Sequence, residues 1–104
     1  MLSLNGFELA GIATNGAQVV EMFKDFTEKP DVILMDHRMP VKNGIDASKE
    51  ILQINPDVKI LFITADQTIK KEAFSIGIAG FIDKPFTIQQ LISSIKQCLD
   101  RYNW

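Results

Sequence analysis

The sequence has little of what marks a secreted, membrane or nucleic-acid-binding protein. It contains one cysteine, Cys98, so it cannot form an internal disulfide, and we expect a reducing compartment. No run reaches the about 18 apolar residues that span a membrane, and the first residues lack the pattern of a secretory signal. The net charge of -2 argues against a surface for nucleic acid or anionic lipid. These absences predict a cytoplasmic protein that binds neither nucleic acid nor membrane.

The chain also lacks linkers, charge blocks and internal repeats. Its 104 residues, 46% hydrophobic and 23% charged, have the composition of one globular domain. We therefore expect a single domain over 1–104, with no effector domain.

Strand and helix patterns alternate along the chain. The continuous apolar runs at 32–35 and 59–64 are typical of strands that are covered on both faces in a parallel sheet. Further short strands are predicted at 7–14 and 79–83. Amphipathic spacing predicts helices at 17–28, 44–55, 67–77 and 87–102, with Gly77 as a C-cap and Thr87 as an N-cap. This alternation indicates parallel strands with helical crossovers, in a three-layer α/β domain.

Three of these strands end on a polar residue: Asp36, Thr64 or Lys84. Because the carboxyl ends of parallel strands share one edge of a sheet, we expect these side chains to converge there. A carboxylate, a hydroxyl and an ammonium in one place suit chemistry on an anionic group, with the carboxylate as nucleophile. Each residue also has an ordinary interpretation. Asp36 could accept backbone N–H groups at a turn, Thr64 could simply end a strand, and Lys84 could be a surface lysine.

The motifs that carry these residues resemble the receiver domain of two-component response regulators, the CheY-like family. They are "DVILMDHRMPVKNG" (31–44), "ILFITA" (60–65) and "AGFIDKPF" (79–86), and the resemblance extends over essentially the whole chain. It implies a flavodoxin-like parallel sheet of strand order 2-1-3-4-5. It also implies a phosphoprotein that works in phosphorelay signal transduction.

The resemblance assigns roles to five residues. Asp36 would be the phosphoacceptor, receiving a phosphoryl group from a histidine kinase or phosphotransfer protein. Lys84 would contact the acyl phosphate, and Ala65 would leave room for it. The Thr64 hydroxyl would swing towards the phosphoryl group, and Phe81 would be the switch aromatic that follows it.

Further expectations come from the same resemblance. The peptide Lys84-Pro85 would be cis, and Gly44 would open the helix after the active-site loop. The backbone carbonyl of Arg38 would join Asp36 in binding Mg²⁺. The 67–102 face would bind an output partner protein.

The beginning of the chain departs from the family pattern. In receivers, two adjacent acidic residues follow the first strand and hold Mg²⁺ together with the acceptor aspartate. By comparison, 1–104 lacks that first strand, the acidic pair and most of the first helix, and is incomplete at the N-terminus. We therefore expect Mg²⁺ binding to be weak or lost. Asp66 is expected to be a helix N-terminal acid, and Asp83 to point to the other face of its strand.

A missing strand would leave a slot beside the strand at 32–35. The segment at 7–13 could move into it, or exposed strand edges could pair with a second copy of the chain. Alternatively, Asn5-Gly6 between two apolar runs could form a hairpin. Of these three arrangements we favour self-association, which predicts a homodimer.

Two functional interpretations follow from the sequence. The leading one is a signalling receiver that is phosphorylated on Asp36 and acts through protein contacts. The alternative is a degenerate receiver, a phosphorylation-independent interaction or dimerisation module, because the acidic pair is missing. We expect no enzyme, since a phosphoaspartyl phosphatase of the haloacid dehalogenase kind needs a carboxylate where this chain has Arg38.

Overall fold

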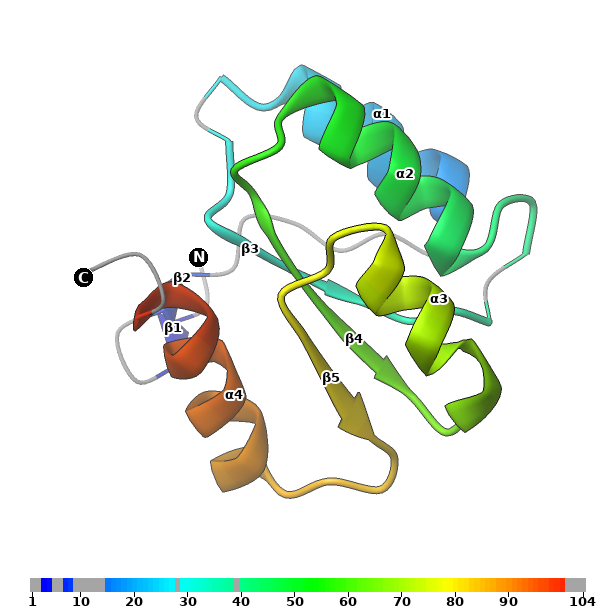
Figure 1. Ribbon diagram of the computed structural model, residues 1–104. Coiled ribbons are helices and arrows are strands. Elements are labelled where there is room, and N and C mark those ends of the chain that lie inside the picture. Colours follow the sequence, from blue (N-terminus) through cyan, green and yellow to red (C-terminus); the bar gives the residue numbers. More distant parts are fainter. Residues whose placement is uncertain (1–2, 5–6, 9–14, 28, 39, 101–104) are drawn as a thin grey trace.

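The central feature of the fold is a three-stranded parallel sheet of order β3-β4-β5 (Figure 1). The computed structural model describes residues 3–4, 7–8, 15–27, 29–38 and 40–100. Its strands are β3 (Val32–Met35), β4 (Lys59–Thr64) and β5 (Gly80–Asp83). The two continuous apolar runs are therefore strands with the predicted bounds, and the third strand starts one residue later than predicted.

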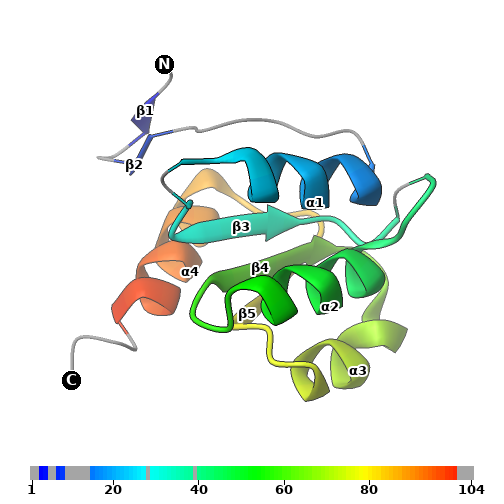
Figure 2. The same cartoon turned by 90° about the horizontal axis from the view of Figure 1, so that it is seen from above.

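Helices cover both faces of this sheet (Figures 1 and 2). They are α1 (Gly16–Asp25), α2 (Gly44–Ile54), α3 (Lys70–Ser75) and α4 (Ile88–Asp100), with a 3₁₀ turn η1 (Gln67–Ile69) before α3. Successive residues of β4 point to opposite faces. Ile60 and Phe62 pack with α1, α2 and α3, whereas Leu61 packs with α4. This arrangement confirms the predicted three-layer α/β architecture.

Side-chain caps explain where the helices begin and end. The N–H of Gln90 donates to Thr87 Oγ1 at 3.0 Å and the N–H of Thr87 donates to Gln90 Oε1 at 2.8 Å, so Thr87 is the predicted N-cap of α4. Helix α3 ends at Ser75 with Ile76 as its C-cap, and Gly77, which was predicted as the C-cap, is the left-handed residue that follows, with φ of 104°.

Helix α1 ends at Asp25, before the predicted end at 28. The ammonium of Lys29 donates to the carbonyl oxygens of Phe23 at 2.6 Å, Lys24 at 2.9 Å and Phe26 at 2.9 Å. Because these carbonyls carry the negative end of the helix dipole, the lysine charge stabilises the early termination. The helix therefore ends before it reaches Pro30, and the proline does not set its end.

The N-terminal strands do not join the parallel sheet. Strand β1 (Ser3–Leu4) pairs antiparallel with β2 (Phe7–Glu8), with Leu4 opposite Phe7. The prediction of a parallel strand at 7–14 is therefore wrong for Phe7–Glu8, and 9–14 lie outside the described residues. The physical reason is local: pairing across so short a loop costs little closure entropy. Of the three arrangements considered, the hairpin is the one found here.

Strand β3 lies at the edge of the sheet. Within the described residues it pairs with β4 alone, and Leu34 is 46% exposed although the next residue, Met35, is 1% exposed. An apolar side chain is therefore left in solvent beside a strand edge. None of the helices in the described part of the chain is long and apolar enough to cross a membrane.

Candidate functional site

The residues at the three strand ends lie at one edge of the sheet, as predicted. Asp36 follows β3, Thr64 ends the central strand β4, and Lys84 follows β5. The ammonium Nζ of Lys84 donates to Asp36 Oδ2 at 2.8 Å, although 48 residues separate the two in sequence. Their side chains are 43% and 41% exposed, so the pair is open to an approaching molecule. Thr64 is buried.

The carboxylate of Asp36 is also tied to the loop that follows it. Its Oδ1 accepts the backbone N–H of Arg38 at 3.2 Å, so the turn-capping interpretation holds alongside the ion pair with Lys84. Gly44 then opens α2, as predicted. A Cβ at Gly44 would lie 2.7 Å from the backbone oxygen of Asp36, which explains why glycine is needed there. The loop is thus packed closely against the start of α2.

Val41 gives this loop a strained turn. Its φ is +70°, and the N–H of Lys42 donates to the carbonyl of Pro40 at 2.8 Å, which together describe a γ-turn of the rare, left-handed form. A β-branched residue is disfavoured there because its Cβ crowds the backbone. The strained turn lies between Asp36 and α2.

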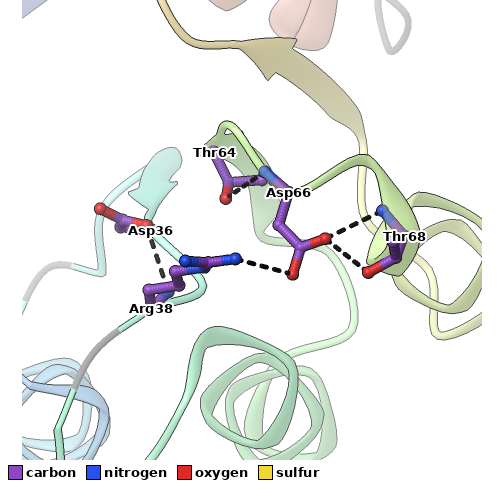
Figure 3. Close-up of polar contacts among 5 residues, drawn as sticks. All are labelled: Asp36, Arg38, Thr64, Asp66 and Thr68. Carbon is purple, nitrogen blue, oxygen red and sulfur yellow. Dashed lines mark hydrogen bonds and ion pairs between the residues drawn. The ribbon is translucent and has the colours of Figure 1, made fainter.

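Asp66 lies beside the site and is held by Thr68 (Figure 3). Its Oδ1 accepts the backbone N–H of Thr68 at 3.0 Å and also the Thr68 hydroxyl, which caps η1. The two hydrogen bonds from Thr68, first the hydroxyl and then the backbone N–H, lower the pKa of Asp66 below its ordinary value, with help from Arg38. Asp66 is therefore the helix N-terminal acid that we predicted.

The same residue connects two loops of the site. Arg38 Nη2 lies 3.8 Å from Asp66 Oδ2, and the backbone N–H of Asp66 donates to Thr64 Oγ1 at 3.1 Å (Figure 3). Sequence reasoning missed this ion pair between Arg38 and Asp66. The signal was nevertheless present: each residue lies two positions after Asp36 or Thr64, the polar residues that close neighbouring strands, and the two charges are opposite.

Phe81 lies in an aromatic cluster on the sheet. It is directly opposite Phe62 across β4 and β5, and the ring centroids are 6.4 Å apart. The Phe74 ring centroid lies 6.5 Å from that of Phe81, and Lys70 Nζ lies 5.6 Å from it. The predicted switch aromatic is thus half-buried, with α3 on one side of it.

Receiver domains typically use Mg²⁺, and the side chains described here do not by themselves make a site for it. Magnesium requires near-octahedral oxygen ligation. Among the described residues there is no group of three or more His, Cys, Asp or Glu that could hold a metal ion. Asp36 is paired with Lys84, Asp66 with Arg38, and Asp83 accepts a hydrogen bond from Gln67. The peptide Lys84-Pro85 is cis, as the resemblance implied.

Comparisons with known proteins agree with this fold. The response regulator receiver domain family matches residues 1–96. The chemotaxis protein CheY of Thermotoga maritima is 43% identical over 94 residues, which are 88% of this chain and 77% of the relative. That of Bacillus subtilis is 38% identical over 102 residues, which are 96% of this chain and 83% of the relative.

A solved structure has a similar fold. The response regulator domain of Thermotoga maritima CheB, 28% identical, superposes with a TM-score of 0.81 and covers 93% of this chain and 80% of that one. The chain belongs to the response regulator receiver domain family. Its function is therefore two-component signal transduction, and its architecture is the flavodoxin-like α/β fold.

Proposed function

We propose that this receiver accepts a phosphoryl group on Asp36 from a histidine kinase or phosphotransfer protein, and signals through protein contacts. The observation that carries the proposal is the 2.8 Å contact between Lys84 Nζ and Asp36 Oδ2 at an open edge of the sheet. A carboxylate oxygen attacks phosphorus, the bond from phosphorus to the donor breaks, and an acyl phosphate forms. The Lys84 ammonium stays beside the new phosphoryl oxygens and neutralises their charge.

Thr64 supports the same chemistry. Its Oγ1 accepts the N–H of Asp66, and a hydroxyl that accepts one hydrogen bond still has its own hydrogen to donate. That hydrogen serves a phosphoryl oxygen on Asp36 when Thr64 turns towards it. Ala65, exposed at the next position, leaves space there. Phe81 then changes its position in the aromatic cluster.

The output partner binds the 67–102 face. Phe74 is 43% exposed on this face, next to Phe81. A cavity of about 200 Å³ lies between α3, β5 and α4, lined among others by Phe74, Phe81 and Cys98. A rearrangement of Phe81 changes the lining of this cavity, so the surface that a partner meets depends on the state of Asp36.

The proposal also covers metal binding, self-association and cellular location. This chain binds Mg²⁺ weakly by itself, through Asp36 and the Arg38 backbone carbonyl. It self-associates through the exposed edge of β3, since an unpaired strand edge recruits partners. It acts in the cytoplasm as a signalling module and not as an enzyme. No observation favours the degenerate alternative.

Intact-mass spectrometry after incubation with acetyl phosphate and Mg²⁺ tests the central step. We expect the parent to gain one phosphoryl group and Asp36→Asn to gain none. A gain by both proteins would place the acceptor elsewhere. A folded parent that gains nothing would refute the proposed function.

A further inference from the structure

Arg38 and Lys84 both place positive charge at the acceptor edge. The backbone N–H of Arg38 is hydrogen-bonded to Asp36 Oδ1, so its side chain starts at the acceptor itself. In Figure 3 the guanidinium extends from there towards Asp66. Both residues are therefore close to any phosphoryl group bound to Asp36.

The two partners of the Arg38–Asp66 pair are held very differently. The Asp66 side chain is 18% exposed and fixed by the backbone and hydroxyl of Thr68. The Arg38 side chain is 78% exposed, and within the described residues its one polar contact is the 3.8 Å approach to Asp66. Exposed ion pairs of this kind are weak. Arg38 is therefore the partner that can leave.

A phosphoryl group on Asp36 offers Arg38 a better partner. The group carries about two negative charges at neutral pH, with three acceptor oxygens. A guanidinium binds such oxygens through two parallel N–H donors, and these charge-assisted hydrogen bonds exceed a single long contact with a carboxylate. Since Arg38 is two residues from Asp36, it needs only a side-chain rotation.

We propose that Arg38 is a further phosphoryl-binding residue, which Asp66 holds aside until Asp36 is phosphorylated. Asp66 is then a positioning residue, and it acts on two groups at once. Its carboxylate holds Arg38, and its backbone N–H holds the Thr64 hydroxyl. When Arg38 leaves Asp66, it leaves the same residue whose backbone N–H binds the Thr64 hydroxyl. Asp66 thus connects the two groups that turn towards the phosphoryl group. This inference rests on the proposed phosphorylation of Asp36.

The test compares phosphoryl gain, and its loss after donor removal, in the full chain by intact-mass time courses with acetyl phosphate and Mg²⁺. Arg38→Gln is expected to slow the gain and hasten the loss by about threefold, the size of effect of an exposed charge pair. Asp66→Asn keeps a side-chain oxygen that accepts the hydrogen bonds of Thr68 but removes the charge that binds Arg38. The phosphoryl group should then be gained faster or kept longer. In the Arg38→Gln background, Asp66→Asn is expected to change nothing further.

Two further variants separate the contribution of the Arg38 guanidinium from a general effect of positive charge. Lys49→Gln removes one positive charge from the exposed face of α2 and is expected to behave as the parent. Arg38→Lys keeps the charge without the planar fork and is expected to lie between parent and Arg38→Gln.

The outcomes that overturn the inference are distinct. If Arg38→Gln matches the parent, Arg38 does not bind the phosphoryl group. If Asp66→Asn acts equally in both backgrounds, Asp66 does not work through Arg38. If the folded parent gains no phosphoryl group at all, the proposed function fails and the inference fails with it, whereas the first two results leave phosphorylation of Asp36 intact.

Discussion

Relief of the strained turn at Val41 should stabilise the protein. Val41 has a φ of +70° and is 84% exposed, so a replacement loses almost no buried surface. A residue held in such a sparsely populated backbone region costs about 1–3 kcal/mol, and asparagine is several-fold enriched among non-glycine residues with positive φ. We expect Val41→Asn to raise the free energy of unfolding by about 1 kcal/mol. For a domain of this size, that corresponds to a rise in Tm of about 4–8 °C.

Chemical and thermal unfolding of three proteins would measure this effect. Val41→Thr is the matched control, since threonine is also β-branched and keeps the strain, and it should unfold like the parent. Glycine is a poorer choice because its greater freedom in the unfolded chain offsets part of the gain, by about 0.5–1 kcal/mol. If Val41→Asn is no more stable than Val41→Thr, the turn is not strained and the reasoning is wrong.

Three further predictions concern the helix end, the site and the sheet edge. Lys29→Met removes three hydrogen bonds to carbonyls at the C-terminal end of α1, two of them in the helix and one at its C-cap Phe26, and should cost about 1–2 kcal/mol in urea unfolding. Lys24→Met, its control, loses one exposed 3.7 Å ion pair and should cost little. The pKa of Asp66 is lowered in the folded state, so its contribution to stability is present above its ordinary pKa of 3.8 and is lost as pH falls through the lower folded value. The stability difference between the parent and Asp66→Ala should therefore shrink in strong acid. We expect ultracentrifugation to show self-association of the parent, and Leu34→Lys, which places a charge at the open edge of β3, should abolish it.

Each of these predictions has a result that contradicts it. Equal stabilities for Lys29→Met and Lys24→Met would mean that the carbonyl contacts do not stabilise α1. An unchanged difference between parent and Asp66→Ala from neutral to strongly acidic pH would remove the role of the ionised carboxylate. A parent that sediments as a monomer at every concentration would refute association through β3.

Features that depend on neighbouring residues or on the strand–helix order were predictable from the sequence. The bounds of β3 and β4 followed from continuous apolar runs, since only a doubly covered strand tolerates so many apolar residues in succession. The capping of α4 by Thr87 followed from a threonine directly before the amphipathic pattern. The convergence of Asp36 and Lys84 followed from one topological rule, that parallel strands end at one edge.

Other features depend on which of several competing contacts forms, and they were missed or were not the favoured alternative. The early end of α1 depends on where the Lys29 ammonium folds back, which helical periodicity does not report. The antiparallel pairing of Phe7–Glu8 depends on competition between a local hairpin and a distant sheet. The Arg38–Asp66 pair joins two loops that only the completed sheet brings together.

The sequence by itself thus determined most of the elements, the layers and the sheet edge where Asp36, Thr64 and Lys84 lie, because hydrophobic periodicity and turn chemistry act over a few neighbouring residues. The tertiary structure alone decided which charges meet at that edge. It set Lys84 against one oxygen of Asp36 and let Asp66 hold both Arg38 and the Thr64 hydroxyl. The reason is physical: an ion pair depends on distances of a few ångströms between side chains, and these are established only when separate strands have packed into one sheet.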